Sequence, residues 1–176
     1  AFAAENTGSI TITNATIGNS YSLYKIFDAT YSTDANGNAD AVSYSITTDN
    51  QFFEALFGDG TAANTYFVYN ANTGSVTKKE GVNDSELIKY LTELVAGGAY
   101  ATAVAPVKAT VDGVKFENLP SGYYLITSTL GTTVTITHIF TDDSLTWGKF
   151  EGGWICLNYV KLDADSSAGN STGSSS

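Results

Sequence analysis

Apolar and polar residues alternate in many short stretches of this chain, and turn residues separate the stretches. The first stretch, GSITITNA at 8–15, has an apolar side chain at every second position, which is the pattern of a half-buried β-strand. Similar stretches occupy 21–31, 42–47, 65–70, 75–79, 108–111, 114–116, 123–127, 132–140, 147–150 and 154–160. Because Gly, Asn, Asp and Ser between strands favour tight turns, the pattern predicts a mainly β fold.

The second stretch, YSLYKIFDATY, places charged residues inside an otherwise apolar strand. Strict alternation puts Lys25 on the same face as Leu23 and Phe27, so we expect its side chain to point inward. The same rule puts Asp28 on the opposite face. The alternative is a lysine at the rim of the sheet whose ammonium reaches solvent.

Two segments have apolar residues at helical spacing. The first covers 49–57, with Asp49 as the expected N-cap. The second begins at Asn83, which forms a plausible capping box with Glu86, and it ends at the Gly97-Gly98 pair. Many strands with one or two short inserted helices predict an immunoglobulin-like β-sandwich.

Charge excludes one class of partner. Eight Lys and Arg residues face eighteen Asp and Glu, giving a net charge of −10 at pH 7. Nucleic-acid binding depends on basic side chains that neutralise phosphates, so no nucleic-acid partner is expected. Anionic membrane surfaces are disfavoured for the same reason. No apolar run approaches the roughly 20 residues that span a bilayer, so no membrane insertion is expected either.

The two ends differ in composition from the middle. Residues 1–8 (AFAAENTG) have the Ala-rich character of a leader remnant left by signal-peptide cleavage, and we expect them to be disordered. Residues 9–163 form the predicted domain. Residues 164–176 (ADSSAGNSTGSSS) lack large apolar side chains and predict a flexible tail. The Ala-rich start predicts secretion.

Two segments resemble a known family. GSITITNATIGNSYSLYKIFDATY at 8–31 and FENLPSGYYLITSTLG at 116–131 are similar to the N-terminal domain of Gram-positive major pilins, the sortase-assembled fimbrial shaft subunits. The resemblance extends over residues 8 to 136. It implies an immunoglobulin-like fold and a structural role in a pilus or adhesin. It also implies contacts with other pilin subunits or the cell wall, and a sortase as a possible partner.

The resemblance further implies an isopeptide bond in some members of the family. There, a neutral lysine attacks an asparagine side chain beside a buried carboxylic acid. Lys25 lies at the position of the family's lysine, and Asn158 is the nearest candidate for the asparagine. The strand that carries the acid in the family has no carboxylate here. Asp28, Glu117 or Asp163 would substitute only if the fold brought one of them inward.

A second implied site is the lysine that accepts the sortase-bound acyl group. The family carries it in a Tyr-Pro-Lys-Asn motif at the end of this domain. Here Tyr159-Val160-Lys161-Leu162 stands in that place, without the Pro and the Asn. Lys161 is therefore the candidate acceptor, and a solvated lysine at a strand end is the alternative.

Beyond Gly131 the pilin-like pattern fades. Residues 132–162 form an atypical C-terminal hairpin, and the WGK…GWI…YV pattern resembles part of a bacterial Src-homology-three-like wall-binding domain. This segment either supplies closing strands to the domain or marks a chimeric join. Trp147 and Trp154 are candidates for stacking on glycan or peptidoglycan, although half-buried packing is the commoner role of such residues.

Other chemistry finds little support. His138 is the only histidine and Cys156 the only cysteine, so a zinc site of Cys and His is excluded and no disulfide closes within the chain. The loop DANGNAD at 34–40 lacks the Gly and Glu that a calcium-binding hand requires. We therefore expect no enzyme activity, no catalytic residue, no cofactor and no metal. The alternative function is a cell-wall or glycan-binding module.

Overall fold

The computed structural model describes residues 8–13, 15–33, 35–36, 39–58, 64–129, 133–139, 144–150 and 153–156. These residues form eleven strands and two helices, so the chain is mainly β, as the alternation predicted. The strands are β1 (Gly8–Thr13), β2 (Ser20–Thr33), β3 (Ala39–Ser45), β4 (Phe67–Tyr69), β5 (Ser75–Lys78), β6 (Val107–Lys108), β7 (Val114–Leu119), β8 (Gly122–Ser128), β9 (Thr133–Ile139), β10 (Ser144–Phe150) and β11 (Gly153–Cys156). The helices are α1 (Phe53–Phe57) and α2 (Asp84–Ala96).

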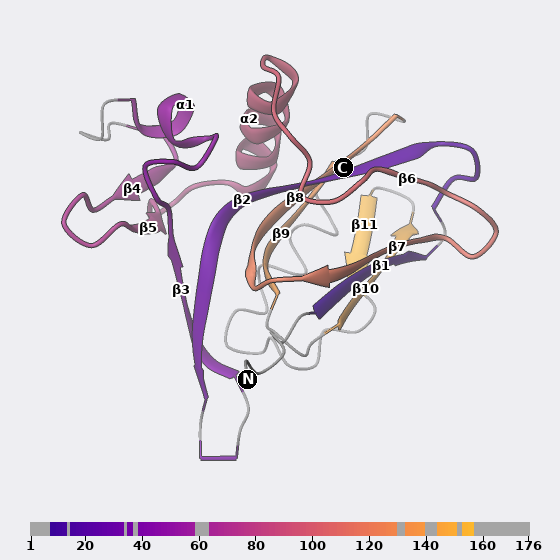
Figure 1. Ribbon diagram of the computed structural model, residues 1–176, viewed down its shortest axis with the longest axis horizontal. Helices are drawn as coiled ribbons and strands as arrows, with labels where there is room; N and C mark the ends of the chain where they lie inside the picture. Colours follow the sequence, from indigo (N-terminus) through magenta and orange to yellow (C-terminus); the bar gives the residue numbers. More distant parts are fainter. Residues whose placement is uncertain are drawn as a thin grey trace, which may run out of the picture.

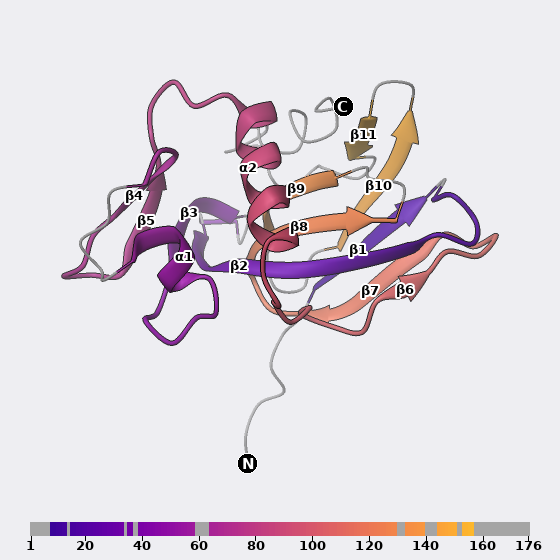
Figure 2. The same cartoon turned by 90° about the horizontal axis from the view of Figure 1, so that it is seen from above.

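The strands pair into two sheets (Figures 1 and 2). A four-stranded sheet has the order β11-β10-β1-β7. A seven-stranded sheet has the order β4-β5-β3-β2-β8-β9, and β6 also pairs with β2. The described strand pairs are antiparallel except β1 with β10, which run parallel. Most of the predicted leader remnant and the whole predicted tail lie outside the described residues, and β1 begins at Gly8.

A first core contains side chains from both sheets, and we call it the sheet core. The four-stranded sheet contributes apolar side chains of β1 and β7, and the seven-stranded sheet contributes those of β2 and β8. Its strand members are Ile10, Ile12, Tyr21, Leu23, Val114, Phe116, Leu119, Tyr124 and Ile126. Within β1 the buried residues are two positions apart, so the alternation seen in the sequence marks the inward face.

A second core lies on the other face of the seven-stranded sheet, and we call it the helix core. Both helices and the β4–β5 hairpin cover this face, and Figure 2 shows α2 lying over β8 and β9. Its members include Phe27, Phe52, Phe53, Phe57, Phe67, Leu87, Leu91 and Tyr123. The helices are therefore a structural layer, because the sheet beneath them would otherwise expose its apolar side chains to water.

Strand β8 is buried on both faces. Tyr124 and Ile126 belong to the sheet core, whereas Tyr123 and Leu125 belong to the helix core. The continuous apolar run GYYLI fits this position, because only a strand covered on both sides favours apolar residues at consecutive positions.

The two helix starts differ in how well the sequence predicted them. The backbone N–H of Glu86 donates to Asn83 Oδ1 at 3.3 Å, so the predicted N-cap of α2 is confirmed. The predicted start of α1 at Asp49 is wrong, because that helix begins at Phe53. The side chain of Asn50 accepts a 2.7 Å hydrogen bond from the Phe52 N–H, and this local turn competes with helical geometry.

A buried asparagine joins the parts of the helix layer. Asn64 is 7 % exposed, and its amide nitrogen donates to the Leu56 carbonyl at 2.9 Å and to the Tyr90 hydroxyl at 3.0 Å. Its amide oxygen accepts from the backbone N–H groups of Tyr66 and Phe67. One side chain thereby links α1, α2 and the start of β4.

Replacing this asparagine tests the link. We expect Asn64→Ala to lower the free energy of unfolding by about 2 kcal/mol, because its buried partners would lose their hydrogen bonds. Urea denaturation measures the change. Asn70→Ala is the matched control, because Asn70 also accepts two backbone hydrogen bonds but lies exposed in the β4–β5 turn. Equal losses in the two variants would contradict the role of burial.

Candidate functional site

A β-bulge in β2 decides where the candidate lysine lies. Lys25 pairs with Tyr124 and Phe27 pairs with Tyr123, so Ile26 is the extra residue between two consecutive partners on β8. Beyond the bulge the side chains change faces. Leu23 packs in the sheet core, whereas Ile26 and Phe27 both pack in the helix core. The prediction that Leu23 and Phe27 share a face is therefore wrong, since strict alternation stops at Ile26.

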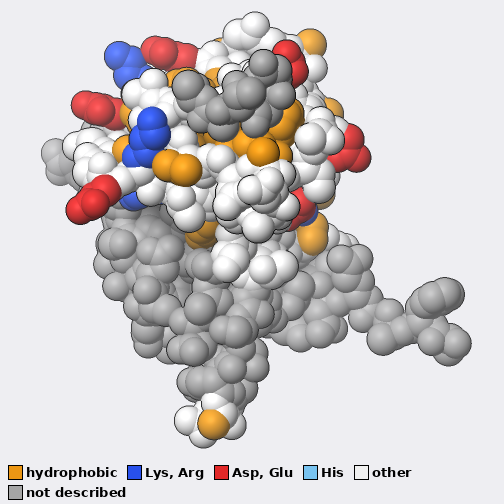
Figure 3. All heavy atoms as spheres, turned by 90° about the vertical axis from the view of Figure 1, so that its left-hand side faces the viewer, with side chains coloured by type: hydrophobic (Ala, Val, Ile, Leu, Met, Phe, Trp, Pro, Cys, Tyr) orange, Lys and Arg blue, Asp and Glu red, His pale blue; other side chains and the backbone are white. Residues whose placement is uncertain are grey.

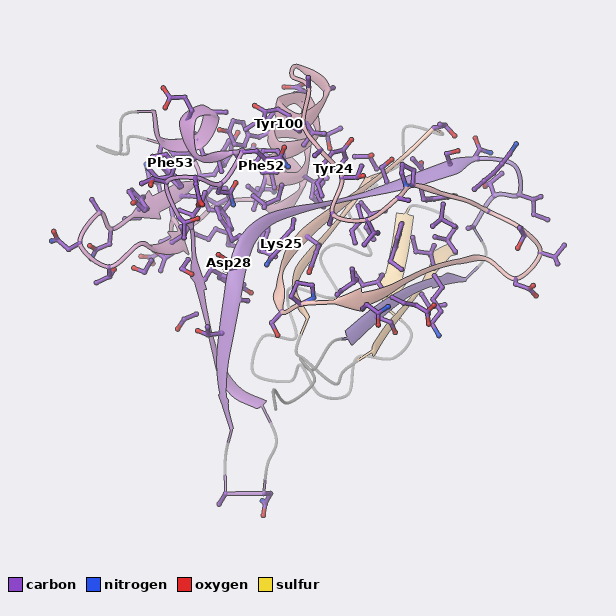
Figure 4. All side chains as sticks on the ribbon, viewed as in Figure 1. Tyr24, Lys25, Asp28, Phe52, Phe53 and Tyr100 are labelled. Atoms are coloured by element: carbon purple, nitrogen blue, oxygen red, sulfur yellow. The ribbon has the colours of Figure 1, made fainter. Side chains whose placement is uncertain are left out.

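The bulge brings a carboxylate to Lys25. Residues three apart in a regular strand point to opposite faces, as the sequence predicted for Lys25 and Asp28. With the extra residue between them, the two side chains instead lie on one face, and Lys25 Nζ is 2.8 Å from Asp28 Oδ1. Figure 4 labels both residues where β2 bends. Their side chains are 28 % and 47 % exposed, so the described residues do not enclose the ion pair.

Gly122 makes room for the lysine. It pairs with Asp28 across the β2–β8 ladder. A Cβ atom at Gly122 would lie 2.9 Å from Lys25 Cε and 3.1 Å from the Phe27 carbonyl oxygen, closer than atoms normally approach. The lack of a side chain therefore allows the Lys25 stem to cross the start of β8.

Tyr124 completes the cluster, and its phenol is held neutral. The ring is buried in the sheet core, and the hydroxyl donates to the Pro120 carbonyl. Burial raises the pKa of Tyr124 well above its ordinary value, and the negative charge of Asp28 raises it further. Lys25, Asp28, Gly122 and Tyr124 together form what we call the bulge cluster.

The bulge cluster contains two of the three groups that isopeptide chemistry requires. Lys25 contacts a carboxylate, and that carboxylate belongs to Asp28, one of the three acids that the sequence offered. Glu117 lies 3.4 Å from Lys115 on β7, and both of these side chains are exposed. Asn158, Lys161 and Asp163 lie outside the described residues. The bond between Lys25 and Asn158 and the acceptor role of Lys161 therefore stay predictions.

Loops cover the edge of β2 next to this cluster, between its pairings with β3 and β6. The Asn50 side chain donates to the Ile26 carbonyl at 3.0 Å, and the Ala103 N–H donates to the Leu23 carbonyl at 2.7 Å. These bonds satisfy two backbone acceptors that a neighbouring strand would otherwise bind.

The two loops are also joined to each other. The Gln51 side chain exchanges two hydrogen bonds of 2.8 Å with the backbone of Ala101. Beside them, the rings of Phe52 and Tyr100 stack with centroids 4.5 Å apart, and Figure 4 labels both above β2. Sequence reasoning missed these contacts, because they join residues about 50 positions apart.

The predicted C-terminal hairpin is present as β10 and β11. The register pairs Trp147 with Cys156 and Lys149 with Trp154, which places Trp154 on the edge strand of the four-stranded sheet and Trp147 on the strand next to it. Within residues 132–162, β9 pairs with β8 and β10 pairs with β1. Of the two interpretations of this segment, the pairing favours closing strands, since it supplies strands to both sheets.

Neither described helix is long and apolar enough to span a membrane. The part of the chain that the structure describes contains no group of three His, Cys, Asp or Glu side chains arranged to hold a metal ion. In the predicted acidic loop, Asn36 lies exposed in a turn, and Asp34 and Asn38 lie outside the described residues. The chain matches no protein-family model and no curated protein.

Crowding at Gly122 gives one testable prediction. We expect Gly122→Ala to lower the free energy of unfolding by about 2 kcal/mol, because the added methyl group overpacks the bulge cluster. The loss should be smaller in a Lys25→Ala background, since Lys25 Cε is the nearest atom to the new methyl group. Urea denaturation of the four proteins in this cycle measures it. An identical loss in both backgrounds would show that the lysine stem is not the obstacle.

The phenol gives a prediction about pH. At neutral pH the wild type should be about 1 kcal/mol more stable than Tyr124→Phe, through the hydrogen bond to Pro120. An unfolded tyrosine loses its proton near its ordinary pKa of 10.0, whereas the raised pKa of folded Tyr124 keeps its phenol protonated there. The folded state then binds more protons, so the advantage of the wild type should shrink by up to about 1.4 kcal/mol per pH unit above that value.

Urea unfolding of both proteins between pH 8 and pH 11, roughly, measures this change. Every other ionisable residue is present in both proteins, so the difference between them isolates Tyr124. A gap that stays constant across the range would argue against the raised pKa.

Proposed function

We propose that this chain is a structural, non-enzymatic module of a bacterial surface pilus or adhesin, secreted to the cell surface and built to bear tension. Its fold in this proposal is an immunoglobulin-like β-sandwich. The shared sheet core supports that fold, because side chains of both sheets pack into one interior. The pilin-like segments at 8–31 and 116–131 supply most of β1, β2, β7 and β8, the four strands of that core.

The parallel pairing of β1 with β10 carries the proposal. Five residue pairs join the two strands, from Ser9 with Ser144 to Thr13 with Gly148. Tension enters β1 from its N-terminal side and reaches β10 from its C-terminal side. In a parallel pair these two points lie at opposite ends of the ladder, so the force slides one strand along the other.

Sliding loads all the hydrogen bonds of a ladder together, whereas pulling two strands apart from one end breaks the bonds one after another. Strand β11 runs back along β10 and would peel away first, after which β10 is pulled from its own end. On its other edge β1 is paired with β7, and its Ile10 and Ile12 are fully buried. The strand that receives the force is thereby fixed on both edges and by its inward face.

Single-molecule pulling on a tandem array of this chain tests the proposal. We expect Thr146→Pro, at the centre of the β1–β10 ladder opposite Thr11, to lower the unfolding force markedly. Thr77→Pro is the matched control, because it makes the same change in β5, outside the line of force. Both variants should lose stability in urea, but only Thr146→Pro should lose mechanical strength.

One result of this experiment would contradict the proposal. Equal unfolding forces for the wild type and Thr146→Pro would remove the support for a tension-bearing role. If Thr146→Pro does not fold, the wild type can be pulled through cysteines placed at Val68 and Thr77, two exposed residues that pair with each other across the β4–β5 hairpin. That geometry separates the hairpin strands from one end, and it should give a lower force than pulling through the chain ends.

The second candidate function is a cell-wall or glycan-binding module. The observation that favours it is the position of Trp147 and Trp154, which lie diagonally across from each other in the β10–β11 hairpin, with Trp154 on the edge strand of the sheet. Sedimentation with purified cell wall tests it. A wall binder should pellet with the wall, and a Trp147→Ala, Trp154→Ala double variant should stay in solution. A structural module without wall affinity should stay in solution in both forms.

A further inference from the structure

Two tyrosines from separate parts of the helix layer lie against each other. Tyr66 directly precedes β4, and Tyr90 lies on α2. Their ring centroids are 4.8 Å apart, and the ring planes are tilted by 40°. The facing edges of two tilted rings lie closer together than the centroids, so carbon atoms of the two phenols are in van der Waals contact. The fold thus holds together two side chains that are 24 positions apart in the sequence.

The side chain of Asn64 fixes this pair. Its amide nitrogen donates to the Tyr90 hydroxyl at 3.0 Å, and its amide oxygen accepts from the Tyr66 backbone N–H at 2.8 Å. Asn64 is itself only 7 % exposed, so both tyrosines are attached to a buried anchor. Because the Tyr90 oxygen is the acceptor in its bond with Asn64, that bond does not hold the hydroxyl proton. Groups held in contact in this way need little motion to react with each other.

Both rings of the pair are half-buried at the rim of the helix core, where an oxidant in solution reaches them. Figure 3 looks onto the side of the molecule that carries β4 and β5, and hydrophobic side chains, a class that includes tyrosine, reach the surface there among uncharged ones. Tyr44 and Tyr123 form a second pair, but Tyr123 is only 4 % exposed. The planes of that pair are 85° apart, so the edge of one ring meets the face of the other. Access and geometry therefore favour the pair of Tyr66 and Tyr90.

We propose that Tyr66 and Tyr90 form a site of oxidative cross-linking, at which a carbon–carbon bond joins the two rings. A one-electron oxidant, such as a haem peroxidase supplied with hydrogen peroxide, removes one electron from each phenol while each hydroxyl releases its proton. The two radicals couple through the carbon next to the hydroxyl on each ring. The hydrogen on each of these carbons then moves to the oxygen and restores both hydroxyls. The protein loses two hydrogen atoms in total, and hydrogen peroxide becomes two molecules of water.

The new bond closes a loop from residue 66 to residue 90, which contains β4, β5 and the first half of α2. The chain has one cysteine, so no disulfide within it closes such a loop. A covalent cross-link restricts the unfolded chain and thereby stabilises the folded one. Because Asn64 already joins these elements, the cross-link adds a covalent connection where the fold holds them in contact. This inference goes beyond the proposed function and does not depend on it.

Oxidation of the whole chain by a haem peroxidase and hydrogen peroxide tests the site. The protein is kept dilute, so that links between copies form slowly, and the monomer is isolated afterwards. We expect the monomer to show the fluorescence of coupled phenols, a mass lower by two hydrogen atoms, and a cross-linked pair of peptides that contain Tyr66 and Tyr90. It should also unfold at a higher urea concentration than the untreated protein.

Substitutions of single tyrosines assign the product. We expect Tyr66→Phe and Tyr90→Phe each to lower its yield about tenfold, because phenylalanine forms no phenoxyl radical and the remaining tyrosine loses its fixed partner. Phenylalanine keeps the ring packing, so both variants should fold. Tyr69→Phe is the matched control and should keep the yield, since Tyr69 is half-buried on β4 and stacks on Phe57. Oxidation of the urea-unfolded wild type should remove the preference for the pair, because the fold creates the contact.

Two results would overturn the proposal. The first is a yield that stays unchanged in both Tyr66→Phe and Tyr90→Phe, which would assign the product to other tyrosines. The second is a wild type that gives no cross-linked monomer, either with the peroxidase or with a small photosensitised oxidant, a ruthenium tris-bipyridine complex with persulfate. The small oxidant reaches half-buried rings that a bulky enzyme does not. The outcome is separable from the pulling experiment, because neither tyrosine lies in β1 or β10.

Discussion

The pairing of β2 with β8, interrupted by the bulge at Ile26, is the constraint on which the rest of the structure depends. These two strands separate the sheet core from the helix core, and both cores take side chains from both strands. The bulge lets β2 supply Leu23 to one core and two consecutive residues, Ile26 and Phe27, to the other. Without it, Phe27 would lie on the face of Leu23, and the helix layer would lose a ring that contacts Phe67 and Tyr123.

The same bulge explains the geometry around Lys25. It brings Asp28 onto the lysine's face, and the lysine stem then requires a glycine at position 122 on the neighbouring strand. The ion pair, the glycine and the neutral phenol of Tyr124 are thus consequences of one extra residue in β2. Lys25, the candidate for the isopeptide bond, therefore lies in a cluster that links two central strands.

In the proposed function, the four-stranded sheet and the helix layer have different roles. The four-stranded sheet holds the parallel β1–β10 ladder, which lies in the line of tension. The helix layer stiffens the opposite face of the seven-stranded sheet through Asn64 and the loops that cover the edge of β2.

The sequence by itself determined the elements, because each depends on neighbours in the chain. Short apolar stretches between turn residues marked segments that overlap all eleven described strands, and the Asn83 cap with its apolar stripe marked α2. Only the tertiary structure decided the bulge at Ile26, the start of α1, the contact of Lys25 with Asp28 and the partner of β10. The bulge cannot be recognised in the local sequence, because Lys25, Ile26 and Phe27 are compatible with a regular strand and with a bulged one. What selects one register is the packing of Phe27 and Tyr123 in the helix core, most of whose other members lie far away in the sequence.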